Sequence, residues 1–362
     1  MSVKIINADV LDGLKSLPDE SVNCVVTSPP YWGLRDYGVA GQIGLESTPQ
    51  EFVARMVEVF REVRRVLRKD GTCFVNLGDS YAGSWGAQSR DNPGNQTTST
   101  IQGGSTLSAR QIKAHQKETQ TGSLKNTPGL KAKDLIGIPW RVALALQDDG
   151  WWLRQDIIWH KPNPMPESVT DRCTKAHEYI FLLTKSERYC WDADAIREAS
   201  AWEPSKSKMP DGWDTGPGGH GSFHREGREK GRKAGNKTHK GVAAAEAGDA
   251  FHATKAGLLK VADVEWSGSN KRSVWTIATA PFSEAHFATF PPELPEICIK
   301  AGCPKGGTVL DPFGGAGTTG LVADRLQRNA VLVELNPEYA AMAERRINAD
   351  RGGLLDVMEA AE

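Results

Sequence analysis

Short apolar runs that each end at a polar or proline-rich turn restrict what this chain can fold into. They are rich in Val and Ile and do not alternate with polar residues, which is typical of strands buried on both faces. The runs are Lys4–Asn7, Val22–Thr27, Thr72–Leu77, Tyr179–Thr184, Thr308–Leu310 and Ala330–Val333. We therefore expect a sheet that is covered on both sides.

Amphipathic helices are predicted between these runs. Residues Pro49–Arg68 place apolar side chains along one stripe, and Gly71 follows as a stop signal. Three further segments show the same pattern: Ile138–Gln147, Gly320–Gln327 and Pro337–Asn348. Strands that alternate with helices predict an α/β domain with a mainly parallel sheet. Because active sites in such sheets lie beyond the carboxyl ends of the strands, the unusual turns should converge.

Two basic segments interrupt this pattern. The 362 residues carry a formal net charge of -1. Residues 83–133 nevertheless hold seven Lys/Arg against two Asp/Glu, and residues 204–260 hold eleven against six. Neither segment has the apolar content to bury a core of its own. They are either solvated loops or segments that contact a polyanion.

Several classes of protein are excluded by features that the chain lacks. No apolar run approaches the roughly 18 residues of a membrane helix, and the first residues do not read as a signal peptide. The six cysteines are scattered without a CxxC pair. We therefore expect no disulfide framework, no metal site and no contact with a membrane, and a cytoplasmic location.

A glycine-rich turn follows the run Thr308–Leu310. Residues Gly315–Gly320 match the pattern GxGxxG, which lets the backbone approach a ligand at a helix N-terminus. The acidic Glu334 ends the next run, where it can accept hydrogen bonds from ribose hydroxyls. The pattern alone is weak, because a turn without a ligand or a dinucleotide enzyme would also show it.

A proline-rich turn, Val26–Tyr31, follows the run Val22–Thr27. Its two prolines remove two N–H donors and leave carbonyl groups as free acceptors. Ser28 adds a hydroxyl acceptor and Tyr31 adds a flat face. The turn can cradle a planar group that bears an amino group, although an ordinary Pro-Pro turn is the alternative.

Taken together, the two turns resemble the motifs of the DNA methyltransferases that methylate amino groups with S-adenosylmethionine. Residues Asp311–Thr319 (DPFGGAGTT) resemble the cofactor motif, and Thr27–Tyr31 (TSPPY) resembles the catalytic motif. The catalytic motif comes first, as in the β group, whose motifs are circularly permuted. Further resemblance lies in Asp156–Asn163, Ala176–Phe181 and His286–Leu294. The resemblance implies a Rossmann-like methyltransferase sheet with inserted basic DNA-recognition segments.

The resemblance also implies the residues that hold S-adenosylmethionine. Glu334 would hold the ribose, Asp9 would contact the adenine amino group, and the glycine turn would shape the methionine end of the pocket. The complete predicted cofactor set is Asp9, Asp311, Phe313, Gly315, Gly317, Thr318 and Glu334.

The catalytic residues implied by the resemblance are Ser28, Pro29, Pro30 and Tyr31. The Ser28 hydroxyl and the Pro29 carbonyl would accept hydrogen bonds from the target amino group. Tyr31 would stack on a base that has left the helical stack. The next residue, Trp32, is expected to line the same base pocket.

The target base follows from a few residues only. The cysteine of C5-cytosine enzymes lies in a Pro-Cys pair, which this chain lacks, so C5 methylation is excluded. Ser28 before the two prolines resembles the N4-cytosine enzymes, and N6-adenine methylation is the alternative. Methylation of RNA or of a protein amide, a catalytically inactive DNA-binding protein and a nicotinamide dehydrogenase are more distant alternatives.

The predicted organisation has one catalytic-motif half (1–82, continued at 134–192), a polar basic insert (83–133), a target-recognition region (193–272), a cofactor-binding half (273–350) and a C-terminal tail (351–362). Double-stranded DNA is the expected partner, and a homodimer and a cognate restriction enzyme are open possibilities. The residues expected to bind DNA are Lys206, Lys208, Arg225, Arg228, Lys230, Arg232 and Lys233.

Overall fold

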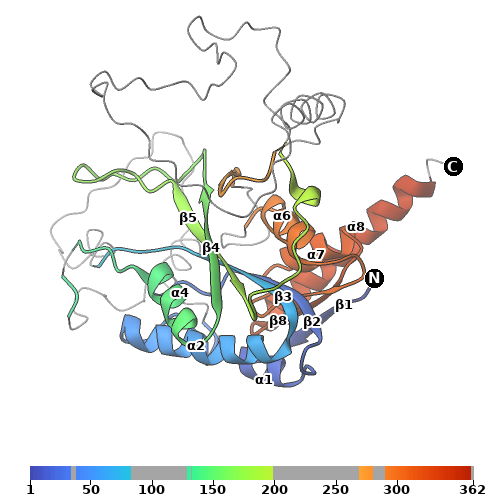
Figure 1. Ribbon diagram of the computed structural model, residues 1–362, viewed down its shortest axis with the longest axis horizontal. Helices are drawn as coiled ribbons and strands as arrows, with labels where there is room; N and C mark the ends of the chain where they lie inside the picture. Colours follow the sequence, from blue (N-terminus) through green and yellow to red (C-terminus); the bar gives the residue numbers. More distant parts are fainter. Residues whose placement is uncertain (34–37, 83–128, 132, 199–268, 280–289, 360–362) are drawn as a thin grey trace, which may run out of the picture. The chain divides into compact units, whose positions relative to one another are not determined.

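The computed structural model describes residues 1–33, 38–82, 129–131, 133–198, 269–279 and 290–359 (Figure 1). The chain divides into one compact unit of Met1–Ile196 with Lys271–Glu362, and a second of Arg197–Asn270. Most of the second unit and of the insert 83–133 lies outside the described residues, as do all seven residues expected to bind DNA. The fold below is that of the first unit.

The described residues form an eight-stranded sheet in the order β1-β8-β7-β2-β3-β5-β4-β6. The strands are β1 (Val3–Asn7), β2 (Val22–Thr27), β3 (Leu67–Leu77), β4 (Trp152–His160), β5 (His177–Thr184), β6 (Val274–Thr276), β7 (Thr308–Asp311) and β8 (Asn329–Glu334). Only β5 pairs antiparallel with its neighbours, β3 and β4, among these strands. The predicted α/β fold with a mainly parallel sheet is confirmed.

Helices cover both faces of the sheet (Figure 1). The elements α1 (Val10–Lys15), α2 (Pro49–Val66) and α4 (Ile138–Asp148) contribute to one core. The elements α6 (Glu293–Gly302), α7 (Thr318–Arg325) and α8 (Pro337–Glu359) contribute to the other. Along β2, Val25 enters the first core while Cys24 and Val26 enter the second. Both faces of the strand are therefore buried, which explains the unalternating apolar runs.

The boundary between α2 and β3 differs from its prediction. The helix ends at Val66 instead of Arg68, and the strand begins at once with Leu67 instead of Thr72. Leu67 is fully buried and pairs with Val22 of β2. Tertiary pairing therefore overrides the helical periodicity and the stop signal at Gly71.

Four helices and strands have no counterpart in the prediction: α1, β4, β6 and α6. β4 was not expected because its residues from Arg154 to Asp156 are polar and exposed, which hides the strand pattern. The helix α6 lies next to a proline-rich segment that reads as a loop. None of the described helices is long and apolar enough to cross a membrane.

Candidate active site

The sheet order brings the two unusual turns side by side. β2 pairs directly with β7, so the turns that follow both strands lie at the same edge. The Thr27 hydroxyl donates a 2.6 Å hydrogen bond to Asp311 Oδ1 across 284 residues of sequence. The convergence predicted from the strand pattern is therefore present.

Asp311 joins the two turns from inside the protein. Its Oδ2 accepts a 2.7 Å hydrogen bond from the Thr319 hydroxyl, and its Oδ1 also accepts from the Phe313 N–H at 3.1 Å. The residue is 2% exposed, and this burial raises the pKa of its carboxyl to about 7. Both carboxyl oxygens accept hydrogen bonds from the protein, so Asp311 ties the two turns together, and its part in a cofactor pocket stays a prediction.

The first part of the glycine turn is open and faces Glu334. A side chain at Gly315 would meet nothing closer than the Phe313 carbonyl oxygen, 3.9 Å away. The Gly315 N–H donates to Glu334 Oε2 at 2.7 Å, and the Asn336 N–H donates to Oε1 at 2.8 Å. Burial raises the pKa of Glu334. Because an ionised carboxylate offers about four acceptor positions, it keeps capacity for ribose hydroxyls.

The second part of the glycine turn packs against α8. Gly317 has φ +77°, and a Cβ there would lie 2.7 Å from the Ala343 Cβ. Thr318 is buried, and its hydroxyl accepts a 2.9 Å hydrogen bond from Arg346. These two residues hold the turn against the helix, and a direct contact of either with the cofactor stays a prediction.

Asp9 lies one strand away from Glu334 along the same edge. β1 pairs with β8, and Asn7 is opposite Glu334 in the register. The Asp9 side chain caps α1 by accepting a 2.9 Å hydrogen bond from the Leu11 N–H. Asp9 and Glu334 thus follow adjacent strands, with the open Gly315 after the third. This acidic pair fits the ribose and adenine of S-adenosylmethionine, and the open turn fits its methionine end; these contacts stay predictions.

The catalytic turn is held by a buried carboxylate. The Tyr31 hydroxyl donates a 2.7 Å hydrogen bond to Glu178 Oε2. The Asn76 side-chain nitrogen donates to the Tyr31 oxygen at 2.8 Å and to Glu178 Oε2 at 2.9 Å. Lys161 donates to Glu178 Oε1 as its ion-pair partner. Ser28, at the start of the turn, donates to the Tyr31 oxygen at 3.4 Å.

The reversed strand β5 makes this network possible. Because β5 runs antiparallel to β3 and β4, its first residues lie beside their last ones. Leu77 is opposite Tyr179, and Trp159 is opposite Glu178. Glu178 therefore begins a strand yet lies at the edge where the parallel strands end.

Charge compensation keeps Glu178 ionised. Burial alone would raise the pKa of its carboxyl, but the positive charge of Lys161 and the hydrogen bonds from Lys161, Tyr31 and Asn76 outweigh that effect. The pKa of Glu178 therefore lies below its ordinary value. The Pro-Pro-Tyr turn therefore lies against a fixed negative charge, whose oxygens accept hydrogen bonds from Tyr31, Asn76 and Lys161.

Tyr31 is also confined along its ring. A Cβ on Gly78 would lie 2.5 Å from Tyr31 Cε2, so the missing side chain makes room for the ring. Trp32, by contrast, is 1% exposed and donates from its indole nitrogen to the Glu46 carbonyl at 2.8 Å. It belongs to the core, and the expectation that it lines the base pocket is wrong.

Sequence analysis missed Asn76, Lys161 and Glu178. Asn76 is the one polar residue near the end of an otherwise apolar run, which is a usable signal. Lys161 and Glu178 lie inside two segments that resemble family motifs, but no role was inferred for them. Their pairing depends on the register of β4 and β5, which the sequence does not reveal.

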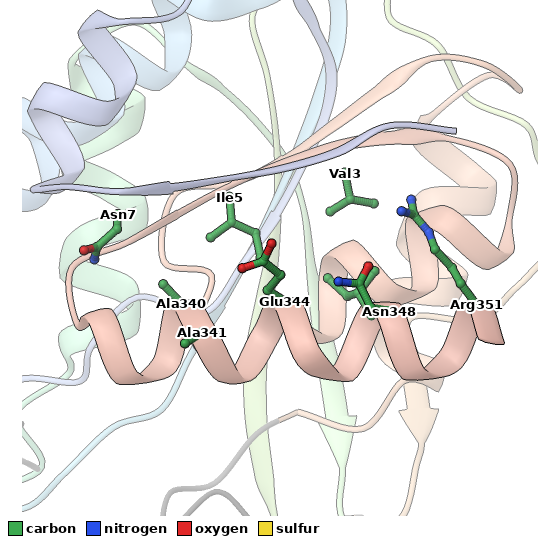
Figure 2. Close-up of a pocket in the computed structure, with 9 residues that line it drawn as sticks. Val3, Ile5, Asn7, Ala340, Ala341, Glu344, Asn348 and Arg351 are labelled. Atoms are coloured by element: carbon green, nitrogen blue, oxygen red, sulfur yellow. The ribbon is translucent and has the colours of Figure 1, made fainter. Parts of the chain in front are cut away.

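A separate cavity of about 280 Å³ lies between the edge strand β1 and α8 (Figure 2). In the close-up, Asn7 lies at one end, and Val3 and Arg351 lie at the other. The lining residues are Val3, Ile5, Asn7, Ala340, Ala341, Glu344, Ile347, Asn348 and Arg351. None of them is a predicted catalytic or cofactor residue, so this cavity is distinct from the candidate active site.

The sheet order and the two joined turns define a Rossmann-like methyltransferase fold, and comparisons with solved structures agree. The cytosine-N4-specific PvuII DNA methyltransferase has a TM-score of 0.54 and 18% identity, with 98% of this chain and 93% of that chain covered. A DNA modification methylase from Thermus thermophilus, TTHA0409, complexed with S-adenosyl-L-methionine, has a TM-score of 0.50 and 22% identity. That match covers 96% of this chain and 95% of the other.

Sequence comparisons identify the family. The profile of the DNA methylase family, which comprises N6 and N4 methyltransferases, matches residues 22–345. The Type II methyltransferase M.Cfr9I of Citrobacter freundii is 39% identical over 98% of this chain and 91% of its own length. M.SmaI of Serratia marcescens is 40% identical over 96% and 91%. The chain belongs to the N6/N4 DNA methylase family, which confirms the predicted S-adenosylmethionine-dependent DNA methyltransferase.

Proposed function

We propose that this chain methylates the N4 nitrogen of cytosine within a specific sequence of duplex DNA. The observation that carries the proposal is Ser28, which opens the Pro-Pro-Tyr turn and lies within 3.4 Å of the Tyr31 oxygen. The cytosine-N4 specificity of the PvuII enzyme, which has the same fold, supports it. Methylation of adenine N6 is the second candidate, because the family includes both activities.

The catalytic turn supplies what amino methylation needs. The lone pair of a nucleobase amino group is delocalised into the ring, so the nitrogen is a poor nucleophile. Hydrogen bonds accepted by Ser28 Oγ and the Pro29 carbonyl favour the pyramidal nitrogen of the transition state. Tyr31 stacks on the flipped base and aligns it, with Pro30 stiffening the turn. With S-adenosylmethionine bound, the nitrogen would form its bond to the methyl carbon as the bond between that carbon and the sulfonium sulfur breaks, and the cofactor would leave as the neutral thioether. The surplus proton of the amino group would pass to solvent along the hydrogen bonds to these acceptors.

The cofactor lies at the neighbouring strand ends in this proposal. S-adenosylmethionine supplies the electrophilic methyl group when bound. Glu334 accepts the ribose hydroxyls, Asp9 accepts from the adenine amino group, and the open backbone at Gly315 borders the methionine end. Asp311 and Phe313 keep this pocket in contact with the catalytic turn.

Partners and location complete the proposal. The basic residues of the target-recognition region neutralise DNA phosphates, and some read guanine edges. The Type II relatives support a cognate restriction enzyme as a functional partner. We propose a cytoplasmic location, and light scattering tests whether the protein forms a homodimer.

The test is mass spectrometry of nucleosides from unmethylated, sequence-diverse DNA incubated with the protein and S-adenosylmethionine. N4-methylcytosine is the expected product. N6-methyladenine would agree with the proposed mechanism but would contradict the inference of cytosine specificity from Ser28. No methylated base, in DNA that the protein binds, would favour an RNA or protein substrate or an inactive enzyme.

Tyr31→Ala separates catalysis from cofactor binding. Loss of base stacking should lower turnover by about 10- to 100-fold. The affinity for S-adenosylmethionine, measured by calorimetry, should stay within about twofold of wild type, because Tyr31 lies on the catalytic side of the site. Turnover at the wild-type rate would show that Tyr31 does not hold the base.

A further inference from the structure

Glu178 sets the direction of the hydrogen bonds around the catalytic turn. An ionised carboxylate only accepts hydrogen bonds. Its neighbours must therefore donate, and they do so from the Tyr31 hydroxyl at 2.7 Å and from Asn76 Nδ2 at 2.9 Å. The Asn76 amide is thereby oriented with its nitrogen toward the carboxylate.

This direction continues to Ser28. The single hydroxyl hydrogen of Tyr31 is donated in the hydrogen bond to Glu178. The Tyr31 oxygen therefore acts as an acceptor toward the Ser28 hydroxyl at 3.4 Å. One Asn76 Nδ2 hydrogen is also shared with Ser28 Oγ, at a longer N···O distance of 3.4 Å. The Ser28 hydrogen is directed into the network, and its oxygen keeps one lone pair. Ser28 is half-buried, so that lone pair is what the hydroxyl offers to a ligand.

Lys161 maintains the charge on which this order depends. Its ammonium group pairs with Glu178, and both side chains are more than four-fifths buried, at 19% and 15% exposure. The same group lies 4.2 Å from the centroid of the Trp159 ring, which holds it in place. The pair is thus a fixed structural feature of the pocket.

We propose that Glu178 is a positioning residue that makes Ser28 a hydrogen-bond acceptor, and that it thereby selects a base with an exocyclic amino group over one with a carbonyl. Cytosine N4 and adenine N6 are donors, whereas the corresponding oxygens of thymine and guanine are acceptors. A fixed acceptor in the pocket favours the first pair and leaves the second unpaired or repelled. The inference rests on the proposed function, because it concerns the same catalytic turn.

The experiment compares wild type with Glu178→Gln, which has nearly the same shape but can donate as well as accept. Two unmethylated duplexes carry the sequence that the enzyme modifies. One has the target base and the other has its deaminated form, which is uracil for cytosine or hypoxanthine for adenine. Wild type should bind the first duplex about 10-fold more tightly than the second. The variant should reduce this ratio to about threefold or less and slow single-turnover methylation by about 10-fold or more, with S-adenosylmethionine affinity unchanged.

Tyr31→Phe is the second variant, because it keeps the ring and removes the hydroxyl that connects Glu178 to Ser28. It should lower the ratio as Glu178→Gln does, and the double variant should lower it no further. Glu296→Gln is the matched control, since it removes a Glu–Lys pair on α6, with Lys300 at 2.6 Å, outside the network. Its ratio should equal that of wild type.

Three outcomes overturn the inference. They are an unchanged ratio in Glu178→Gln, equal weakening of both duplexes with the ratio kept, and additive effects in the double variant. The binding ratio needs no turnover, so it is measured even if the wild-type protein methylates another base. A wild type that binds DNA but methylates no base in it contradicts the proposed function, while the ratio, measured on the bound sequence with its candidate bases deaminated in turn, decides the role of Glu178.

Discussion

Asp311 makes the stability of the protein depend on pH. Its pKa is raised to about 7 in the fold, from an ordinary 3.8, so the folded state binds a proton more tightly than the unfolded chain. The stabilisation from this proton is complete below about pH 4 and is lost as pH rises through about 7. The melting temperature of the cofactor-free wild type should therefore fall between pH 5 and pH 8 relative to Asp311→Asn. Parallel curves for the two proteins would show that Asp311 is ionised throughout.

Glu334→Ala should weaken cofactor binding without unfolding the protein. Hydrogen bonds to a charged group contribute about 1.5–3 kcal/mol each, so calorimetry should show S-adenosylmethionine binding weakened about 10- to 100-fold. Glu338→Ala, four residues later in the exposed first turn of α8, is the control and should bind as wild type does. Equal affinities in all three proteins would remove Glu334 from the site.

At the scale of elements, the contact between the glycine turn and α8 is tight enough to test. Gly317→Ala places a methyl group 2.7 Å from Ala343 at a residue with φ +77°. It should lower the free energy of unfolding by about 1–3 kcal/mol. Gly352→Ala is the matched control, because nothing lies within 4 Å of its Cβ position in α8. It should stabilise the protein by up to about 1 kcal/mol, and similar values for both variants in urea titrations would contradict the contact.

The elements also show what the sequence can reveal. β2 and β7 can be predicted from the sequence because both faces of each strand carry apolar side chains. The turns after these two strands contain Ser28 and Gly315. β4 is not readable, because tertiary pairing with β5 stabilises a strand whose polar residues face solvent. The same limit applies to the active site. Ser28 and Tyr31 lie on one turn, whereas Glu178 reaches them only through the register of an antiparallel strand.

At the scale of the whole molecule, the uneven charge predicts salt-dependent DNA binding. If the seven Lys and Arg residues expected to bind DNA each neutralise one phosphate, replacing them all with Gln should reduce the slope of log affinity against log salt by about 6. Lys15, Lys69 and Lys305 serve as the control. They are exposed near the amino ends of strands, opposite the active-site edge, and replacing them should change the slope by less than about 1. If both sets of substitutions changed the slope equally per residue, the DNA contact would not be confined to the seven predicted residues.

The sheet order also determines when the protein can form during its synthesis. β1 and β2 leave the ribosome first, yet they do not pair with each other, because β8 and β7 lie between them. Thr27 and its hydrogen-bond partner Asp311 are 284 residues apart in the sequence. At the usual rate of translation, Asp311 is synthesised roughly 15 to 60 seconds after Thr27. For that interval the nascent chain carries unpaired apolar strand edges. Such edges invite aggregation and chaperone binding, so any chain released before β7 would lack the centre of its sheet.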